Sequence, residues 1–123
     1  MLSVAGSKAN LRSGPGVHYA VRWVYGKGFP LRLLARRGNW YKVIDFERDK
    51  GWIYKKLLSR RPHVIVKKKY ANIRSGPGMK YRLLGKAKYG VVFKTLLSKK
   101  GWVKVRHAKG MVGWISRDLL WGF

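Results

Sequence analysis

Strand-forming residues occur along the chain in short runs that are separated by turn signals. Examples are Leu31–Leu34 and Trp40–Ile44 in the first half and Val91–Lys94 and Trp102–Arg106 in the second. Runs of about four to eight such residues, bounded by Gly, Pro or Asn, are typical of β-strands. No long stretch has the period of about 3.6 residues that marks an amphipathic helix. The pattern predicts an all-β chain of short strands, arranged as a small barrel or sandwich.

The same sequence pattern occurs twice along the chain. Ala9–Gly16 (ANLRSGPG) recurs 62 residues later as Ala71–Gly78 (ANIRSGPG), with no gap needed anywhere between the copies. Over residues 4–58, 19 of the 55 positions are identical at this offset, including two pairs of tryptophans, Trp40/Trp102 and Trp52/Trp114. A repeat of this strength implies two copies of one fold.

The repeat sets the expected domains. We expect a first small barrel over residues 1–59, a short basic linker over 60–65 and a second barrel over 66–123. Pro62 disfavours a continuous helix or strand ladder through the linker. A unit of about 60 residues buries only about 60% of its unfolded surface, so we expect the two barrels to pack side by side.

Alternation along the strands separates a core face from an outer face. Successive side chains of a strand point to opposite sides, so Val43 and Ile53 are expected inside and Trp40 and Trp52 outside. An outward Trp beside cations suits ligand binding, although such rings can also cover a barrel end or a seam between units. The candidate ligand-binding residues are Trp40, Lys42, Trp52, Tyr54, Trp102, Lys104, Arg106 and Trp114.

The repeated Arg-Ser-Gly-Pro-Gly motif has two interpretations. It can be a turn that leaves a strand, with its Arg paired locally, or a nest of backbone N–H groups that binds an anion. We take it as a structural turn. The motif residues are Arg12, Gly14, Pro15 and Gly16 in the first copy and Arg74, Gly76, Pro77 and Gly78 in the second.

The net charge of the chain indicates a class of binding partner. The chain has 29 Lys and Arg against 4 Asp and Glu, a net charge of +25. Such a field attracts polyanions, whether nucleic acid, anionic lipid surfaces or acidic wall polymers. Three of the four acids lie in Asp45–Asp49, on an expected hairpin tip, which makes the second unit the better candidate for facing an anion.

Catalysis and cofactors are not expected. The chain has no Cys, and its three histidines, His18, His63 and His107, are isolated in sequence. A metal or catalytic site needs convergent ligands or a positioned base. We therefore expect that the chain is not an enzyme and that it has no catalytic residue, no metal site and no cofactor. No apolar stretch approaches the roughly 20 residues of a membrane-spanning helix.

The motif set as a whole resembles the bacterial SH3 (SH3b) domain family. It consists of the Arg-Ser-Gly-Pro-Gly turn, then Gly38–Val43, Gly51–Ile53 and Leu57-Leu58, each with a counterpart in the second copy. Trp23–Tyr25, Gly28–Leu31 and the closing Asp118–Phe123 are similar to a subfamily that occurs as tandem pairs. The resemblance implies a barrel of about five or six strands for each unit. It also implies a binding role, often in the cell envelope, where related domains bind peptidoglycan or accompany wall hydrolases.

Three functions stay open. The first is a non-catalytic envelope module that binds peptidoglycan or another anionic wall polymer. It would be periplasmic or secreted, with a signal peptide that is not among these residues. The second is a cytoplasmic nucleic-acid-binding protein, whose charge and surface aromatics would hold unpaired bases. The third is a module that docks on a protein partner.

Overall fold

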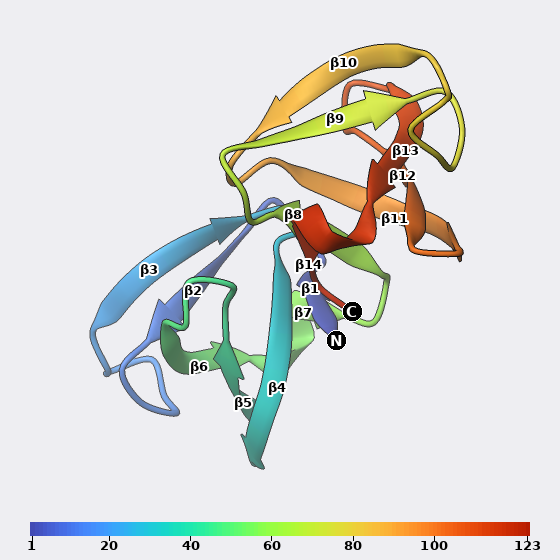
Figure 1. Cartoon of the computed structure of the whole chain (residues 1–123). Helices are drawn as coiled ribbons and strands as arrows, with labels where there is room; N and C mark the ends of the chain where they lie inside the picture. Colours follow the sequence, from blue (N-terminus) through green and yellow to red (C-terminus); the bar gives the residue numbers. More distant parts are fainter. The chain divides into compact units, whose positions relative to one another are not determined.

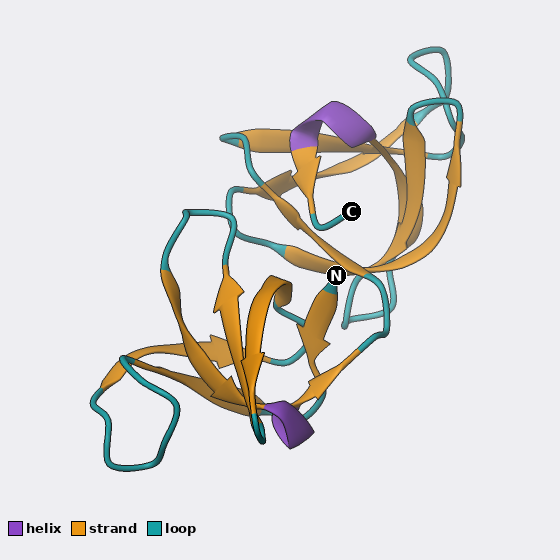
Figure 2. Ribbon diagram, turned by 90° about the horizontal axis from the view of Figure 1, so that it is seen from below, coloured by secondary structure: helices purple, strands orange, loops and turns teal.

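The computed structural model describes all residues, 1–123, and the chain forms two compact units, Met1–Arg61 and Pro62–Phe123. Each unit is one antiparallel sheet of seven strands with a single short 3-10 turn. Strands make up most of both units in Figures 1 and 2. The predicted all-β fold of two repeated units is confirmed. The division falls inside the segment expected as a linker, and a strand begins at His63.

The strands of the first unit are ordered β3-β2-β6-β5-β4-β1-β7 in the sheet. Their bounds are β1 Leu2–Val4, β2 Lys8–Arg12, β3 Val21–Gly26, β4 Pro30–Arg37, β5 Trp40–Ile44, β6 Lys50–Tyr54 and β7 Leu58–Ser59, with the 3-10 turn η1 at Lys55–Leu57. The count is higher than the five or six strands that the resemblance implied, because the very short β1 and β7 also pair.

The second unit repeats this order as β10-β9-β13-β12-β11-β8-β14. Its elements are β8 His63–Val66, β9 Tyr70–Arg74, β10 Leu83–Lys88, β11 Val92–Lys99, β12 Trp102–Arg106, β13 Val112–Ser116, η2 Arg117–Leu119 and β14 Leu120–Trp121. Apart from β8, which starts one residue earlier, every element lies 62 residues after its counterpart. The sequence repeat is therefore a repeat of structure, strand for strand.

The longest strand of each sheet carries a bulge. β4 pairs with β1 at its start and with β5 further along, and its register shifts between Leu33 and Ala35. β11 shifts in the same way between Thr95 and Leu97. An extra residue in one strand increases the local twist and bends it. Figure 2 shows that the sheets are strongly curved.

The predicted inward positions form the cores. Val43 and Ile53 have no exposed surface in the first unit, and Val103 and Ile115 have none in the second. Tyr41, which alternation puts on the same face of β5 as Val43, is only partly buried and packs against the first core. The buried core residues are Val4, Ala9, Leu11, Tyr25, Leu31, Val43 and Ile53 in the first unit, and Val64, Val66, Ala71, Ile73, Ala87, Phe93, Val103, Val105, Ile115 and Leu120 in the second.

Gly51 marks the closest approach of two strands. β6 meets β2 at the pair Arg12–Trp52, next to this glycine. A Cβ at position 51 would lie 2.6 Å from Leu11 Cγ and 2.7 Å from the Arg12 carbonyl oxygen. The second contact is with backbone, which cannot turn aside as a flexible side chain can. Glycine is required here because of the contact between strands.

We therefore predict that Gly51→Ala destabilises the first unit by about 1–3 kcal/mol, the usual cost of overpacking. Gly26→Ala is the matched control, because a Cβ at position 26 meets nothing within 4 Å. Urea unfolding followed by NMR of first-unit resonances measures both variants. Equal stability of the two variants would contradict the close packing of β2 against β6.

Candidate ligand-binding site

Two aromatic rings face each other on the outer side of the β5–β6 hairpin. Trp40 lies directly opposite Tyr54 in the ladder, and Lys42 lies opposite Trp52. The ring centroids of Trp40 and Tyr54 are 5.7 Å apart and the planes are tilted by 57°. Cross-strand aromatic pairs at such distances stabilise each other and hold each other's orientation. The hairpin thus presents a fixed corner of two aromatic rings.

The loop after β2 is closed by the arginine of the repeated motif. Arg12 Nη1 donates hydrogen bonds to the carbonyl oxygens of Val17, at 3.1 Å, and Tyr19, at 3.0 Å. The Gly16 N–H donates to Gly14 O at 2.9 Å. This Gly16 donor is used within the turn, which leaves it unavailable to an anion. The geometry agrees with a structural turn.

Tyr19 packs on the glycine of the same loop. A Cβ at Gly14 would lie 2.4 Å from two atoms of the Tyr19 ring, so only glycine allows the ring to lie there. Gly76 and Tyr81 repeat the contact in the second unit, and Arg74 Nη1 donates to Tyr81 O at 3.1 Å. The loop has a defined shape in both units.

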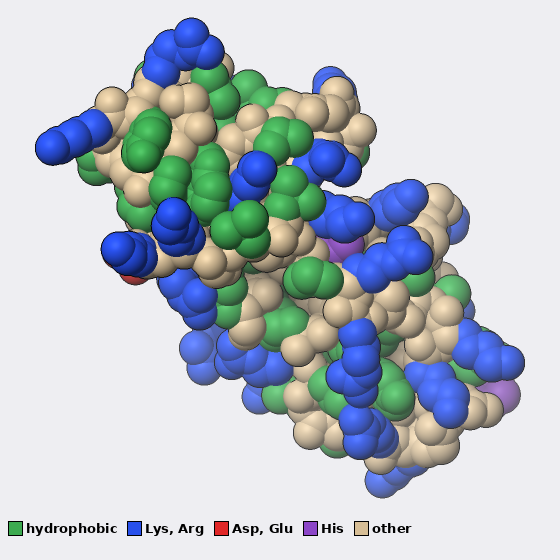
Figure 3. Space-filling model, turned by 90° about the vertical axis from the view of Figure 1, so that its right-hand side faces the viewer, with side chains coloured by type: hydrophobic (Ala, Val, Ile, Leu, Met, Phe, Trp, Pro, Cys, Tyr) green, Lys and Arg blue, Asp and Glu red, His purple; other side chains and the backbone are tan.

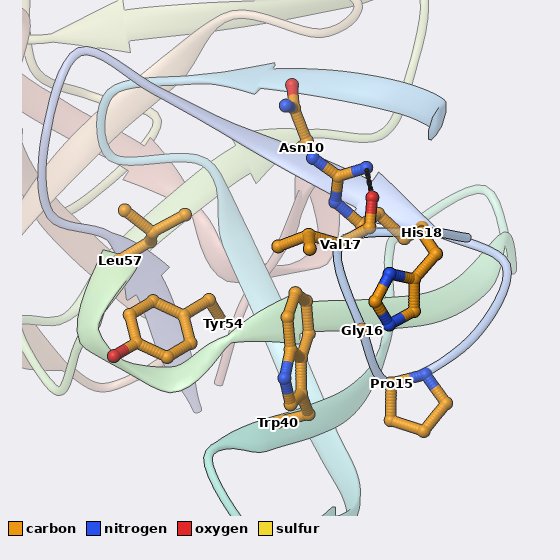
Figure 4. A pocket seen from close by; sticks show the side chains of 9 residues that line it. Asn10, Pro15, Gly16, Val17, His18, Trp40, Tyr54 and Leu57 are labelled. Carbon is orange, nitrogen blue, oxygen red and sulfur yellow. Dashed lines mark hydrogen bonds between the residues drawn. The ribbon is translucent and has the colours of Figure 1, made fainter. Parts of the chain in front are cut away.

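A pocket of about 580 Å³ lies between this loop and the aromatic corner. Figure 4 shows Trp40 and Tyr54 on one side, with the loop residues Pro15, Gly16 and His18 near Trp40. A pocket of this size, with apolar walls and a few polar groups, suits a small ligand or one unit of a polymer. The remaining lining residues are Asn10, Arg12, Val17 and Leu57.

The structure brings together five of the predicted residues and leaves others outside. Of the first-unit candidates, Trp40 and Tyr54 line the pocket with the turn residues Arg12, Pro15 and Gly16, whereas Lys42 and Trp52 do not. The guanidinium of Arg37 lies 5.9 Å from the centroid of the Trp52 ring, over its face.

Sequence reasoning missed four lining residues, Asn10, Val17, His18 and Leu57. Asn10 belongs to the repeated ANLR segment, which was a usable signal. The loop and η1 fold toward the hairpin, and this brings Val17, His18 and Leu57 to the pocket. Residue spacing alone does not reveal such folding.

The second unit keeps the tryptophan and loses its partner ring. Trp102 lies opposite Ser116, which replaces Tyr54, and Lys104 lies opposite Trp114. Trp102, Lys104 and Trp114 are half-buried, and Arg106 is exposed. The aromatic corner therefore exists in the first unit, and the second presents a single ring among cations.

On the face that Figure 3 shows, lysine and arginine are scattered rather than gathered in one groove. Histidine, aspartate and glutamate form no group of three that could hold a metal ion. None of the helical turns approaches the length and apolar character of a membrane-spanning helix.

The acidic segment 45–49 forms the tip of the β5–β6 hairpin, as expected, and one of its acids is a buried anchor. Asp45 is 2% exposed. Its Oδ2 accepts a hydrogen bond from the Tyr25 hydroxyl at 2.7 Å, and its Oδ1 accepts from the N–H groups of Glu47 and Asp49, both at 2.9 Å. A buried carboxylate is tolerated because its oxygens are hydrogen-bonded. Asp45 shapes the loop and cannot reach a ligand.

Tyr25 shares this buried environment. Burial, together with the hydrogen bond to Asp45, raises the pKa of the Tyr25 hydroxyl well above its usual range. The neutral phenol is the form that fits, since a phenolate would place a second negative charge beside the buried Asp45 carboxylate.

Comparison with known proteins agrees with the sequence motifs. The family described as "Bacterial SH3 domain" matches residues 5–60 and again residues 67–122. The chain belongs to the bacterial SH3 domain family. This bacterial SH3 pair is 25% identical over 126 residues to "Putative N-acetylmuramoyl-L-alanine amidase YrvJ" of Bacillus subtilis (strain 168). The match covers 94% of the pair and 24% of that protein.

Solved structures similar to the pair include NlpC2 from Trichomonas vaginalis, at 15% identity and a TM-score of 0.44. An NlpC/P60 family protein from Bacillus cereus ATCC 10987 has 16% identity and a TM-score of 0.43. They cover 99% and 98% of the pair, which spans 48% and 56% of their own lengths.

The raised pKa of Tyr25 predicts a loss of first-unit stability in alkali. The folded state holds the proton more tightly than the unfolded chain, whose tyrosines ionise near pH 10. The contribution is thus complete below pH 10 and is lost as the pH rises above it, by about 1.4 kcal/mol per pH unit. Urea unfolding of wild type and Tyr25→Phe between pH 8 and about 11 measures the slopes. The same slope in both would contradict the buried phenol–carboxylate pair.

Proposed function

We propose that this bacterial SH3 pair is a non-catalytic binding module of the bacterial cell envelope, which holds peptidoglycan or another anionic wall polymer. The observation that carries the proposal is the pocket of about 580 Å³ in which Trp40 and Tyr54 face the Arg12 loop. The proposed location is periplasmic or secreted, where such a polymer is found. No step of covalent chemistry is assigned to the chain.

The aromatic corner suits a sugar–peptide polymer. A sugar ring has an apolar face of C–H groups and a rim of hydroxyls, so it can stack on a fixed indole while its rim meets polar groups. Asn10 and His18 supply such groups on the pocket wall. Arg12 Nη1 donates its hydrogen bonds within the loop, so Arg12 sets the shape of the pocket wall and adds positive charge to it. The peptide carboxylates of the polymer would meet a strongly positive surface.

Family membership supports the same class of ligand. The matched relative is named as an amidase for N-acetylmuramoyl-L-alanine, a linkage between a wall sugar and its peptide. The pair spans about a quarter of that protein, so its enzymatic activity is not transferred here. We propose for this pair only that its SH3 domains bind the wall polymer as a ligand.

Trp40→Ala is predicted to weaken binding to purified sacculi about tenfold, since a ring at the centre of a binding pocket commonly contributes this much or more. The measurement is co-sedimentation at about 0.5 M salt, where exposed charges are largely screened. Trp23→Ala is the matched control, because Trp23 is 52% exposed on β3 and lies outside the pocket. No retention of the wild type, or equal retention of the two variants, would contradict the proposal.

Nucleic acid is the second candidate, and the net charge of +25 is the observation that favours it. We predict that single-stranded DNA binds at about 0.05 M salt and is released at about 0.5 M, because charge alone holds it. Trp40→Ala should leave this binding unchanged. DNA binding that survives at the higher salt and needs Trp40 would instead support the nucleic-acid function.

A further inference from the structure

The second unit contains an apolar pocket of about 430 Å³ on the side of β10 that faces the loop after β12. Its floor includes Ala87 and Phe93, which are almost fully buried, and its edge includes Val91 and Met111. This pocket is separate from the aromatic corner, since it shares no residue with the Trp40 pocket and lies wholly in the other unit.

The first unit shows what can fill this place. Tyr25 lies opposite Ala9 in the ladder, just as Ala87 lies opposite Ala71, so Tyr25 and Ala87 are equivalent positions. The Tyr25 ring packs on Phe29 at a centroid distance of 4.5 Å. Phe29, in turn, lies 6.0 Å from Phe46. At an offset of 62 residues these three aromatics are replaced by Ala87, Val91 and Ala108.

The core compensates for only part of the lost volume. Leu31 is replaced by Phe93, whose ring meets the His107 ring edge-on at 5.5 Å. The pocket remains beside this pair and is lined by both rings. A domain normally fills such space, since unfilled apolar volume costs stability. The first unit fills the equivalent place from its own chain, and the second leaves it open.

The loop beside the pocket keeps its shape without the tyrosine. His107 replaces Asp45, and its Nδ1 accepts a hydrogen bond from the Lys109 N–H at 3.1 Å, as Asp45 accepts from the Glu47 N–H. Arg48 and Gly110, at the same loop position, both have positive φ. An imidazole has thus replaced the carboxylate that receives the Tyr25 hydroxyl in the first unit.

The charge of the residues around the pocket also differs between the two units. Lys86, Lys88 and Lys109 line the pocket, where the first unit has Val24, Gly26 and Glu47. Lys86 and Lys88 flank the inward Ala87 on β10, so their side chains leave on the outer face of that strand, where Lys86 Nζ lies 5.9 Å from the centroid of the Tyr70 ring. Lys109 belongs to the loop after β12. The apolar pocket therefore lies in a positive field, which attracts an anionic ligand.

We propose that the pocket of Ala87, Phe93 and His107 binds a small molecule with one aromatic ring and one carboxylate or phosphate. The ring occupies the volume that Tyr25 fills in the first unit, and the anionic group lies at the mouth of the pocket beside the Lys109 loop, in the positive field to which Lys86 and Lys88 add. A volume of 430 Å³ suits a single ring with its substituent. This site does not depend on wall binding by the first unit.

The test uses 4-hydroxyphenylacetate, titrated into the full chain and followed by NMR of the Ala87 and Met111 methyl groups. For a ligand of this size we expect a dissociation constant of about 1 mM. Acetate, which lacks the ring, and 4-hydroxyphenylacetamide, which lacks the charge, should each bind at least about fivefold more weakly. No saturable shift with the acid, or equal binding of the uncharged amide, would overturn the proposal.

Variants distinguish this pocket from general attraction to the basic surface. Ala87→Tyr restores the ring of the first unit and should abolish binding, and Val91→Phe should do the same if Ala87→Tyr fails to fold. Lys88→Gln/Lys109→Gln should weaken binding about fivefold, whereas Lys27→Gln, in the first unit, should leave it unchanged. Unchanged binding by a folded Ala87→Tyr or Val91→Phe would overturn the proposal. Binding only of an acetylated Glu-Tyr-Glu peptide would also overturn it, in favour of a protein partner.

Discussion

The alternation of side chains in the hairpin of β5 and β6 is the constraint on which the candidate site depends. Val43 and Ile53 are fully buried on one face of this hairpin, and the pairing of the two strands is continuous. A strand cannot turn one side chain inward without turning its neighbour outward. Burial of the aliphatic residues therefore places Trp40 and Tyr54 together on the outer face, where a pocket can form.

The second requirement is a wall opposite these rings, and the loop after β2 supplies it. Its shape is set by the Arg12 hydrogen bonds and by the contact of Tyr19 with Gly14. The motif Arg-Ser-Gly-Pro-Gly is thus structural in its chemistry and can still serve binding through its position. A loop residue that bonds only within its own loop can decide the form of a pocket in this way.

Much of this could be predicted from sequence, since the repeat and the period-two pattern depend on local rules. Both predicted strand faces and the outward Trp40 follow from alternation alone. The burial of Asp45 could not be predicted, because a carboxylate in a polar loop is usually solvated and its partner Tyr25 lies 20 residues earlier. The convergence of Asn10 and Leu57 on the hairpin depends on how loops fold in three dimensions, which residue spacing does not encode.

The two units show how one backbone can carry two different surfaces. The first combines Trp40 with Tyr54 and fills its own core with Tyr25, whereas Ser116 and Ala87 stand at these positions in the second. The elements correspond strand for strand, so the differences come from side chains at a few positions. Duplicated domains can diverge in this way because a core tolerates substitutions that keep the hydrophobic pattern.

The most direct test of the account is an NMR titration of the six tryptophan indole N–H signals with a soluble muropeptide. The account predicts the largest shift for Trp40, saturating with ligand and persisting at about 0.5 M salt, with little change for Trp23. Shifts that spread evenly over the tryptophans and disappear with salt would mean that charge alone binds the polymer. That result would contradict a shaped site at the aromatic corner.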